Sequence, residues 1–514
     1  MLANRLLVLA ALALFSVGCG KPRAVPASIP PAAPAELTTP EGGEEEEEEE
    51  EEDDDDDGFG GPSGPPSTKP AAKPAVKPAD SGPPPAWAQE AAAKLTAHAK
   101  GKRRAWERLA EVADRFGPRP AGSKSLEDAI DWSITTMRAD GLTDARREKV
   151  MVPNWRRGKE SLRIVAPVER DLRILGLGGT VGTKGTLRAP LMVVRSLEEL
   201  DKRGSEAKGR IVLVNHEMPS YDHEQDDSGY GTAVRPRSEG ASRAAKHGAV
   251  ALLIRSVTAV SLDTPHTGAM RYDEGVRKIP AAAVTVEGAE FLARMAARGS
   301  VEVGLQLGAR ALPDVASANA IAEIRGREKP EEVVVIGGHI DSWDVGDGSS
   351  DDAAGCVMAM EAALMLKELG LVPRRTIRVV LFTNEEYGLR GAKEYFAAHG
   401  EEKHVAAIES DSGAGAPRGF GVASKDPAVV AGVQRFAKLF TGLGADDIDK
   451  GWGGADISPL MENGVLGLSL RPEGSHYFDL HHSPADTVDK IDPEHMQRNA
   501  AAFALMAYIL AERE

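Results

Sequence analysis

Histidine and acidic residues, the side chains that bind metal ions or carry protons, gather in five short segments of this sequence. They are His339-Ile-Asp341, Ser350-Asp351-Asp352, Glu385-Glu386, Ser410-Asp411 and His481-His482-Ser-Pro-Ala-Asp486-Thr487. Imidazole nitrogen and carboxylate oxygen are the ligands that zinc takes where no thiolate is available. The chain has only two cysteines, Cys19 and Cys356, which excludes a thiolate zinc site and a disulfide-stapled scaffold.

These segments supply the residue types that hydrolysis by a pair of metal ions requires. Each ion needs a histidine and a carboxylate of its own, one carboxylate bridges the pair, and another takes a proton from the attacking water. Neighbouring side chains of an extended chain point to opposite sides, so one member of Glu385-Glu386 can hold a metal while the other faces the water. Asp341, two residues after His339, is predicted to accept the imidazole N–H and so to fix its tautomer.

The elements that must position these segments are strands that end immediately before them. β-Rich runs are predicted at 332–336, 376–382 and 405–408, and helices at 88–115, 124–140, 352–369 and 492–512. Ligands bind outside the carboxyl ends of strands in open α/β sheets, so we expect the five segments to converge. The alternation predicts an α/β fold, a three-layer α/β/α sandwich with a mostly parallel central sheet.

The middle of the chain has a different residue pattern, which predicts an inserted β-rich domain over 185–310. Short β-rich runs occur at 191–195, 210–215 and 250–254, with a helical stretch at 239–247, and none of the runs carries a cluster of candidate ligands. The main domain is therefore predicted in two parts, a first part over 88–184 and a metal-site part over 311–514.

The first 87 residues are predicted to be an export signal followed by a linker. Residues 1–19 have an early arginine, an apolar stretch and a Ser16-Val-Gly-Cys19 ending that resembles a bacterial lipobox, although Ser16 stands where the usual lipobox has leucine. This predicts export as a lipoprotein anchored to the cell envelope (outer membrane or periplasm) through Cys19, or secretion after an ordinary cleaved signal. Residues 20–87 are predicted to be a disordered linker, with 15 of the 33 prolines and an acidic run, Glu44 to Asp57.

The overall charge of the chain comes largely from that linker. The net charge is −17, and fourteen of the acids lie in the single run Glu44 to Asp57. The rest of the chain is close to neutral, so no basic face for nucleic acid is predicted.

The motifs resemble those of the di-zinc exopeptidases of the aminopeptidase and glutamate carboxypeptidase type. The stretch Gly337 to Gly355 resembles their first metal motif, Thr383 to Gly391 their Glu-Glu-x-Gly segment, Glu409-Ser-Asp411 their Glu-Ser-Asp, and His481 to Thr487 their His-His-Ser-x-x-Asp-Thr. Pro265-His-Thr-Gly268 resembles part of the family's inserted domain, which is of the protease-associated type. The resemblance runs from about residue 100 to the C-terminus.

The resemblance implies a ligand set for two zinc ions per subunit. One ion is held by His339 and Asp411, the other by Glu386 and His482, and Asp351 bridges them through a carboxylate whose peptide bond to Asp352 is cis. Glu385 is implied as the general base, which takes a proton from a metal-bridging water and later protonates the leaving amine. Many members place a tyrosine before the last histidine to stabilise the oxyanion; here either His481 or Tyr477 takes that role.

The predicted function is that of an exported or lipid-anchored di-zinc exopeptidase that hydrolyses small peptides as a carboxypeptidase or dipeptidase. One alternative is an aminopeptidase on the same fold, for which an anionic patch near Glu409 or Asp456 would bind a free amine; a cation such as Arg471 or Arg418 would instead bind a free carboxylate. The other alternative is a non-catalytic, peptide-binding lipoprotein. The resemblance also implies a homodimer by analogy, and membrane contact is expected only through Cys19.

Overall fold

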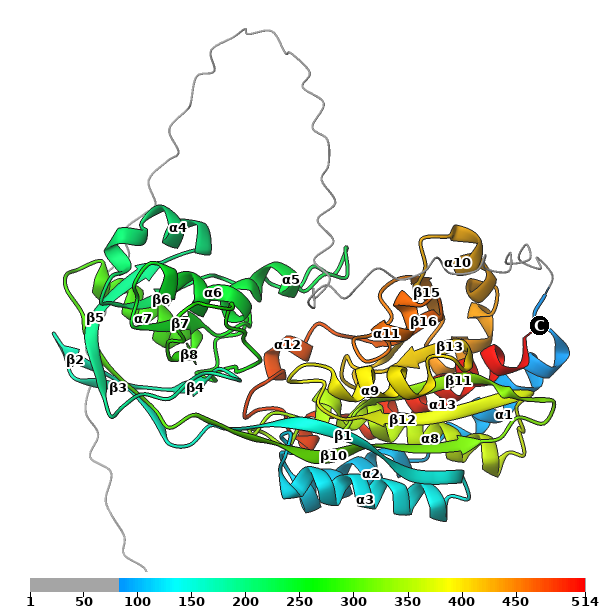
Figure 1. Ribbon diagram of the computed structural model, residues 1–514. Coiled ribbons are helices and arrows are strands. Elements are labelled where there is room, and N and C mark those ends of the chain that lie inside the picture. Colours follow the sequence, from blue (N-terminus) through cyan, green and yellow to red (C-terminus); the bar gives the residue numbers. More distant parts are fainter. Residues whose placement is uncertain (1–82, 514) are drawn as a thin grey trace, which may run out of the picture. The chain divides into compact units, whose positions relative to one another are not determined.

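Two eight-stranded sheets organise the chain in this computed structural model, in which the structure of residues 83–513 is described (Figure 1). The predicted signal segment, Cys19 and the acidic run lie outside the described residues. The first described helix, α1, begins at Ala86, just before the predicted end of the linker at residue 87. Among residues 83–513 there is no helix with the length and apolar character needed to cross a membrane.

The first sheet has a parallel centre, as the sequence predicts. Its strands in spatial order are β1 (Thr143–Arg156), β10 (Arg310–Ile324), β12 (Arg375–Phe382), β11 (Lys329–His339), β13 (Lys403–Glu409), β16 (Leu466–Pro472), β14 (Pro417–Ala423) and β15 (Asp447–Lys450). The four strands β12, β11, β13 and β16 run parallel to one another, and β1, β10 and β14 pair with their inner neighbours in antiparallel fashion.

Helices cover both faces of this sheet, which confirms the predicted α/β/α sandwich. One face packs against α1 (Ala86–Ala99), α2 (Arg104–Phe116), α3 (Lys124–Ala139), α8 (Ala354–Glu368) and α13 (Pro493–Glu512), and the other against α9 (Arg390–His399) and α11 (Ser458–Glu462). Alternate residues of β11 serve the two cores: Val334 and Ile336 face the first group, Val333 and Val335 the second. Two further short helices are α10 (Pro427–Gln434) and α12 (Tyr477–Leu480).

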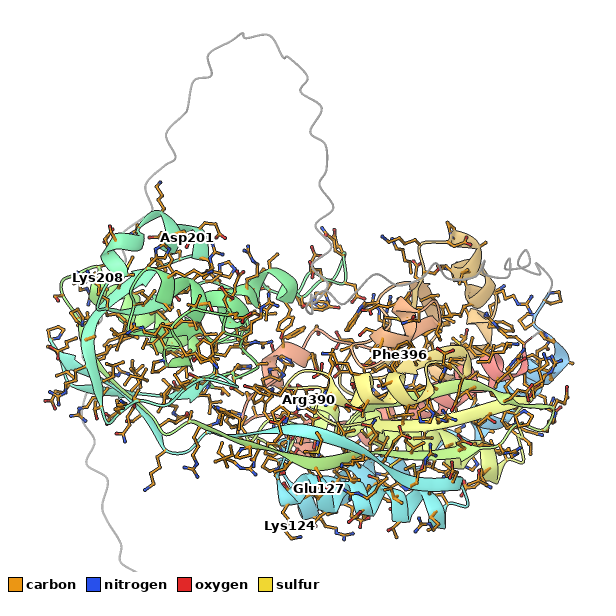
Figure 2. All side chains as sticks on the ribbon, viewed as in Figure 1. Lys124, Glu127, Asp201, Lys208, Arg390 and Phe396 are labelled. Carbon is orange, nitrogen blue, oxygen red and sulfur yellow. The ribbon has the colours of Figure 1, made fainter. Side chains whose placement is uncertain are left out.

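Local sequence explains where these helices begin and end. The Asp492 side chain caps α13 by accepting hydrogen bonds from the main-chain N–H groups of Glu494 and His495, and Pro493 occupies the first turn. The stretch 88–115, predicted as one helix, is two, because Gly101 adopts a left-handed φ of 71° between α1 and α2. Lys124 lies on the outer side of α3 (Figure 2). Its Nζ donates to Oδ1 of Asp128, one turn later, at 2.6 Å.

The second sheet lies within the middle of the sequence and is itself flanked by helices. Its strands in spatial order are β3 (Arg170–Leu172), β2 (Glu160–Ala166), β9 (Glu302–Leu307), β5 (Leu187–Val194), β6 (Ile211–Val214), β7 (Ala251–Arg255), β8 (Ala281–Val284) and β4 (Ile174–Gly176). The helices α4 (Leu197–Lys202) and α6 (Arg235–Lys246) pack on one face, and α7 (Val286–Ala296) packs on the other. The short helix α5 (Tyr230–Ala233) precedes α6.

The second sheet begins earlier in the sequence than the predicted insert. Its first strand, β2, starts at Glu160, so the boundary predicted at residue 185 falls inside the sheet. β2 alternates exposed and buried side chains over residues 161–164, and β1 before it does the same over residues 149–152. The long antiparallel strands β1 and β10 lead from the first sheet into the second and back (Figure 1).

Candidate metal site

The predicted convergence of the acidic and histidine segments occurs at one edge of the first sheet. His339 is the last residue of β11, Glu385 and Glu386 follow β12, and Asp411 follows β13. Because β12, β11 and β13 are parallel neighbours, their carboxyl ends lie together, where open α/β sheets bind ligands. His482 reaches the same place from the loop after α12.

Asp351 lies at the centre of this group and contacts both halves of it. Its Oδ1 atom is 3.1 Å from Nε2 of His339, and its Oδ2 atom is 3.2 Å from Nε2 of His482. His339 Nε2 is in turn 3.5 Å from Oδ1 of Asp411, and His482 Nε2 is 2.9 Å from Oε2 of Glu386. The two oxygens of one carboxylate therefore face two separate histidine–carboxylate pairs, as a bridging ligand requires.

The chemistry of these donors fits divalent zinc. Within this group, one buried oxygen of each of three carboxylates has no hydrogen-bond partner among the described residues: Oδ2 of Asp351, Oε1 of Glu386 and Oδ1 of Asp411. Leaving buried carboxylate oxygens unpaired is costly unless a cation compensates them. Imidazole nitrogens beside carboxylate oxygens, with no thiolate, form the donor set of a zinc site that retains positions for water and substrate.

The loop that carries Asp351 is held by a carboxylate that is not part of the metal group. The side chain of Asp486 accepts hydrogen bonds from the main-chain N–H groups of Ser350 (2.7 Å) and Asp351 (3.1 Å). The Asp351–Asp352 peptide bond is cis, as the family resemblance implies. Asp352 accepts from the N–H of Gly355 at 2.9 Å, which is the helix-capping role that its position before α8 favours.

The structure corrects the prediction for Asp341. Nδ1 of His339 lies 3.0 Å from the main-chain oxygen of Asp341 and 3.8 Å from its carboxylate Oδ1. β11 ends at His339, so the extended alternation that the prediction assumed does not continue to Asp341. The main-chain carbonyl therefore fixes the tautomer with the proton on Nδ1 and leaves Nε2 for a metal. The Asp341 carboxylate instead accepts from the main-chain N–H of Glu385 at 3.1 Å.

Glu385 has the properties of a proton carrier. Burial raises the pKa of its carboxyl well above the usual range, and although His339 opposes this shift, the nearby carboxylates of Asp411 and Glu386 add to it. Its side chain has no ion pair among the described residues, whereas that of the adjacent Glu386 contacts His482. Glu386 therefore contacts the group around Asp351 and Glu385 forms no ion pair with it, although the two residues lie in a turn and not in the extended chain that the prediction assumed. Their roles as metal ligand and base stay predictions.

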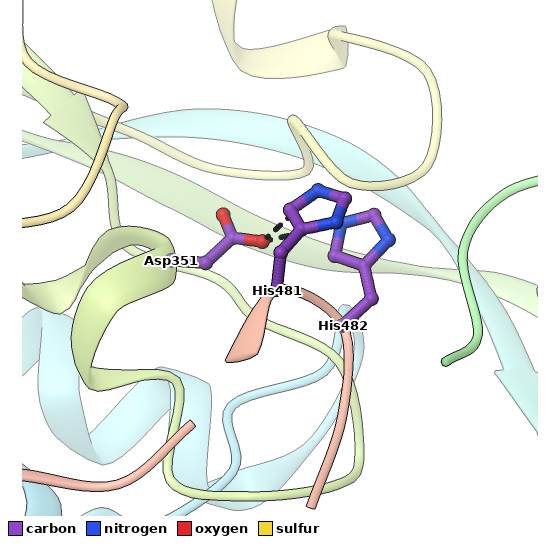
Figure 3. A group of neighbouring side chains, drawn as sticks. All are labelled: Asp351, His481 and His482. Carbon is purple, nitrogen blue, oxygen red and sulfur yellow. Dashed lines mark ion pairs between the residues drawn. The ribbon is translucent and has the colours of Figure 1, made fainter. Parts of the chain in front are cut away.

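Both candidates for the oxyanion role lie beside the site. The His481 ring stacks on that of His482 with centroids 3.5 Å apart, and its Nε2 is 3.7 Å from Oδ2 of Asp351 (Figure 3). Burial lowers the pKa of His481 well below the usual range, so the ring is neutral. The Tyr477 ring packs against His481 with centroids 5.2 Å apart.

The second sheet contributes a cation that sequence reasoning missed. Arg237, in the first turn of α6, is 8% exposed; its Nη1 lies 3.3 Å from Nδ1 of His482, and its Nη2 donates to the hydroxyl of Tyr230 at 2.5 Å. Among the described residues, no carboxylate lies within ion-pair distance of Arg237, and its Nε has no hydrogen-bond partner. No motif surrounds it in the sequence, so only the fold reveals its position.

Comparisons with known proteins agree with this geometry. Residues 319–507 match the family model of Peptidase family M28. The chain is 41% identical to carboxypeptidase Q of Bos taurus and 40% identical to carboxypeptidase Q of Homo sapiens, each over 424 residues that cover 82% of this chain and 88% of the relative.

Solved structures show the same fold. A peptidase M28 precursor from Shewanella amazonensis superposes with a TM-score of 0.79 at 36% identity, over 83% of this chain and 97% of the other. A zinc aminopeptidase from Bacillus subtilis shares the fold, with a TM-score of 0.60 at 21% identity over 80% of this chain and 95% of the other. The fold and the site define a zinc metallo-exopeptidase. The chain belongs to peptidase family M28.

Proposed function

We propose that this protein binds two zinc ions and hydrolyses small peptides as a carboxypeptidase or dipeptidase that recognises the free C-terminal carboxylate. The observation that carries the proposal is Arg237, a buried cation without a carboxylate partner that lies 3.3 Å from His482. The relatives named carboxypeptidase Q support the same preference for the C-terminal end of the peptide.

The proposed ligand sets follow the contacts around Asp351. His339 and Asp411 would hold one ion, Glu386 and His482 the other, and Asp351 both. When bound, the ions supply a water of lowered pKa and a polarised scissile carbonyl. Glu385 takes the proton of the attacking water and returns it to the leaving amine, and His481 or Tyr477 stabilises the oxyanion.

Arg237 is suited to hold the substrate carboxylate. A guanidinium group offers parallel N–H donors that match a carboxylate. A buried charge without a partner is costly, and Nε of Arg237 has no hydrogen-bond partner. When a metal occupies Nε2 of His482, the proton of the ring must be on Nδ1. Nδ1 and the Arg237 guanidinium are then both hydrogen-bond donors. A substrate carboxylate can accept hydrogen bonds from both groups on this side of the ring.

The cations that the sequence suggested for this role are already paired. Arg471 Nη2 lies 2.7 Å from Oδ2 of Asp447, and Arg418 contacts both Asp447 and Asp226. These arginines are therefore less suited than Arg237 to bind a substrate carboxylate.

The aminopeptidase alternative would need an available anionic patch. The carboxylate of Glu409 already accepts hydrogen bonds from the main-chain N–H groups of Ala455 (3.1 Å) and Ile457 (2.9 Å). Burial raises the pKa of Asp456 well above the usual range, so this carboxyl offers no negative charge to a substrate amine. These contacts favour recognition of the carboxylate.

A blocked dipeptide series tests the proposed polarity. We expect hydrolysis to survive N-acetylation and to be lost on C-amidation. Arg237→Gln should raise KM for the free-carboxylate substrate by about 10- to 100-fold, because a charged hydrogen bond is lost. The matched control is Arg235→Gln, on the same helix, whose side chain pairs with Glu239. Equal hydrolysis of amidated substrate, or an unchanged KM for Arg237→Gln, contradicts the proposal.

We propose further that the protein is exported and carries a lipid on Cys19, as its N-terminal sequence indicates. Cys19→Ala should move the protein from the membrane fraction to the soluble fraction, and unchanged fractionation contradicts lipidation.

A homodimer remains a proposal by analogy, for which native mass spectrometry is the test. Purified protein without zinc and without peptidase activity after zinc addition would favour the non-catalytic alternative.

A further inference from the structure

The proposed zinc ligand His482 has an unusual main-chain conformation. Its φ angle is 59°, in the left-handed region that residues other than glycine rarely adopt. Such conformations persist only where the surrounding structure holds them, and they occur at functional sites. The question is therefore which contacts hold the segment His481-His482.

Two hydrogen bonds from the second sheet hold this segment. Nδ1 of His266 lies 2.7 Å from the main-chain oxygen of His481, and the main-chain N–H of Thr267 donates to the oxygen of His482 at 2.9 Å. Because a carbonyl only accepts, Nδ1 of His266 must be the donor. Both contacts join residues more than 200 positions apart in the sequence, and they act on consecutive peptide groups.

The segment that carries His266 and Thr267 is itself anchored to the second sheet. The N–H of His266 donates to Oγ of Ser256 at 2.9 Å, and Oγ1 of Thr267 donates to the main-chain oxygen of Gly176 at 2.8 Å. Ser256 follows β7, and Gly176 ends β4. His266 is 2% exposed. The segment His266-Thr267, between β7 and β8, is therefore anchored by hydrogen bonds to the ends of two strands of the second sheet.

Close packing of this segment leaves no room for a side chain at Gly268. Its φ is 135°, and a Cβ atom there would lie 2.7 Å from Nδ1 of His482 and 2.5 Å from Nη1 of Arg237. The main chain between β7 and β8 thus approaches the ring of His482 as well as its peptide group.

We propose that His266 is a positioning residue of the zinc site: by donating to the carbonyl of His481 it holds His482 in the left-handed conformation that directs its imidazole toward Asp351 and Glu386. The second sheet then completes one zinc site as well as supplying Arg237. This inference rests on the proposed role of His482 as a zinc ligand.

The test separates the effect of the hydrogen-bond donor at the position of Nδ1 from the effect of the volume of the His266 ring. In His266→Asn the amide nitrogen takes the place of Nδ1, whereas in His266→Gln it lies nearer the place of Nε2 and does not reach the His481 carbonyl. The control is His216→Gln, since His216 belongs to the same part of the chain and its Nδ1 also lies near a carbonyl, that of Arg195 at 3.3 Å. The full-length proteins are titrated with a zinc chelator, and zinc content is measured alongside thermal unfolding of the zinc-free form.

We expect His266→Gln to release one of two zinc ions about 10- to 100-fold more readily, which is the usual effect of removing an outer contact of a ligand. His266→Asn should stay within about threefold of the wild type, and His216→Gln should not change. Equal retention of zinc by the glutamine variant overturns the inference, and so does equal loss in both variants, which would assign the effect to the ring. Wild-type protein that binds no zinc would instead overturn the proposed function.

Discussion

The two eight-stranded sheets can be compared at the same place, the carboxyl ends of their parallel strands. In the first sheet, β11 ends at His339, and β12 and β13 are followed by Glu386 and Asp411, whose side chains gather around Asp351 together with that of His482. In the second sheet, β6, β7 and β8 run parallel in the same way, but among the described residues no group able to hold a metal lies there.

The difference lies in whether the polar groups at the strand ends have partners. In the second sheet, Oε1 of Glu290 accepts from Arg255 at 2.9 Å and from Asn215 at 3.0 Å, so the charges are paired. In the first sheet, carboxylate oxygens of Asp351 and Glu386 are buried without hydrogen bonds. Topology places polar residues at the strand ends of both sheets, and we infer from the unpaired carboxylates that one of these edges is suited to bind metal ions.

Removal of the bridging carboxylate should have the largest effect on the first sheet. Asp351→Ala is expected to lose both zinc ions and to reduce turnover by more than about 10⁴-fold, because both ligand pairs share this residue. Metal analysis and dipeptide hydrolysis measure the two effects. Loss of a single ion, with the other retained at full occupancy, would show that Asp351 does not bridge.

Removal of the proton carrier should separate chemistry from metal binding. Glu385→Gln is expected to keep its zinc and to lower kcat by about 10²- to 10⁴-fold, because only proton transfer is removed. The control is the zinc content of the same preparation. Turnover within tenfold of the wild type would show that another group acts as the base.

A substitution at the opposite end of the first sheet should change only the free energy of unfolding. Hydrogen bonds from Lys403 and Arg375 outweigh the effect of burial and lower the pKa of Glu332 to about 2. A carboxylate with a depressed pKa contributes stability above its unfolded pKa of about 4.5, and this contribution is lost as the pH falls toward 2. Glu332→Gln should cost about 2 kcal/mol of unfolding free energy at pH 6 and little near pH 2.

Chemical denaturation of the wild type and the variant at both pH values measures this difference. A cost for Glu332→Gln that stays constant across the pH range would show that the ion pairs around Glu332 are not its source.

Disruption of the paired charges of the second sheet should have the smallest effect. Arg255→Gln is expected to lower the free energy of unfolding by about 1 kcal/mol, because Glu290 keeps the hydrogen bond from Asn215. Zinc content and kcat/KM should stay at the wild-type values. Zinc loss in this variant would contradict the difference between the two sheets, because it would show that the strand ends of the second sheet contribute to metal binding.

Local patterns account for the parts of the molecule that the sequence predicted. The β-branched runs of β11, β12 and β13 and the ligands that follow them lie close in the sequence, so the parallel sheet and the convergence at its edge could be anticipated. The contact of Asp341 was predicted wrongly because the chain leaves the strand conformation at His339.

Long-range contacts account for what could not be predicted. Arg237 and His266 reach His482 and His481 across more than 200 positions, and no periodicity near either residue reports such a contact. The start of the second sheet at Glu160 was missed for a related reason. β1 and β2 each contain a run that alternates exposed and buried side chains, and only their strand partners assign them to different sheets.

The most direct test of the central claim is a crystal structure of the zinc-loaded protein with anomalous diffraction measured at the zinc edge. The account predicts two anomalous peaks, one on each side of the Asp351 carboxylate, with His339 beside one and His482 beside the other. A single peak, or two peaks that do not share Asp351, would contradict it.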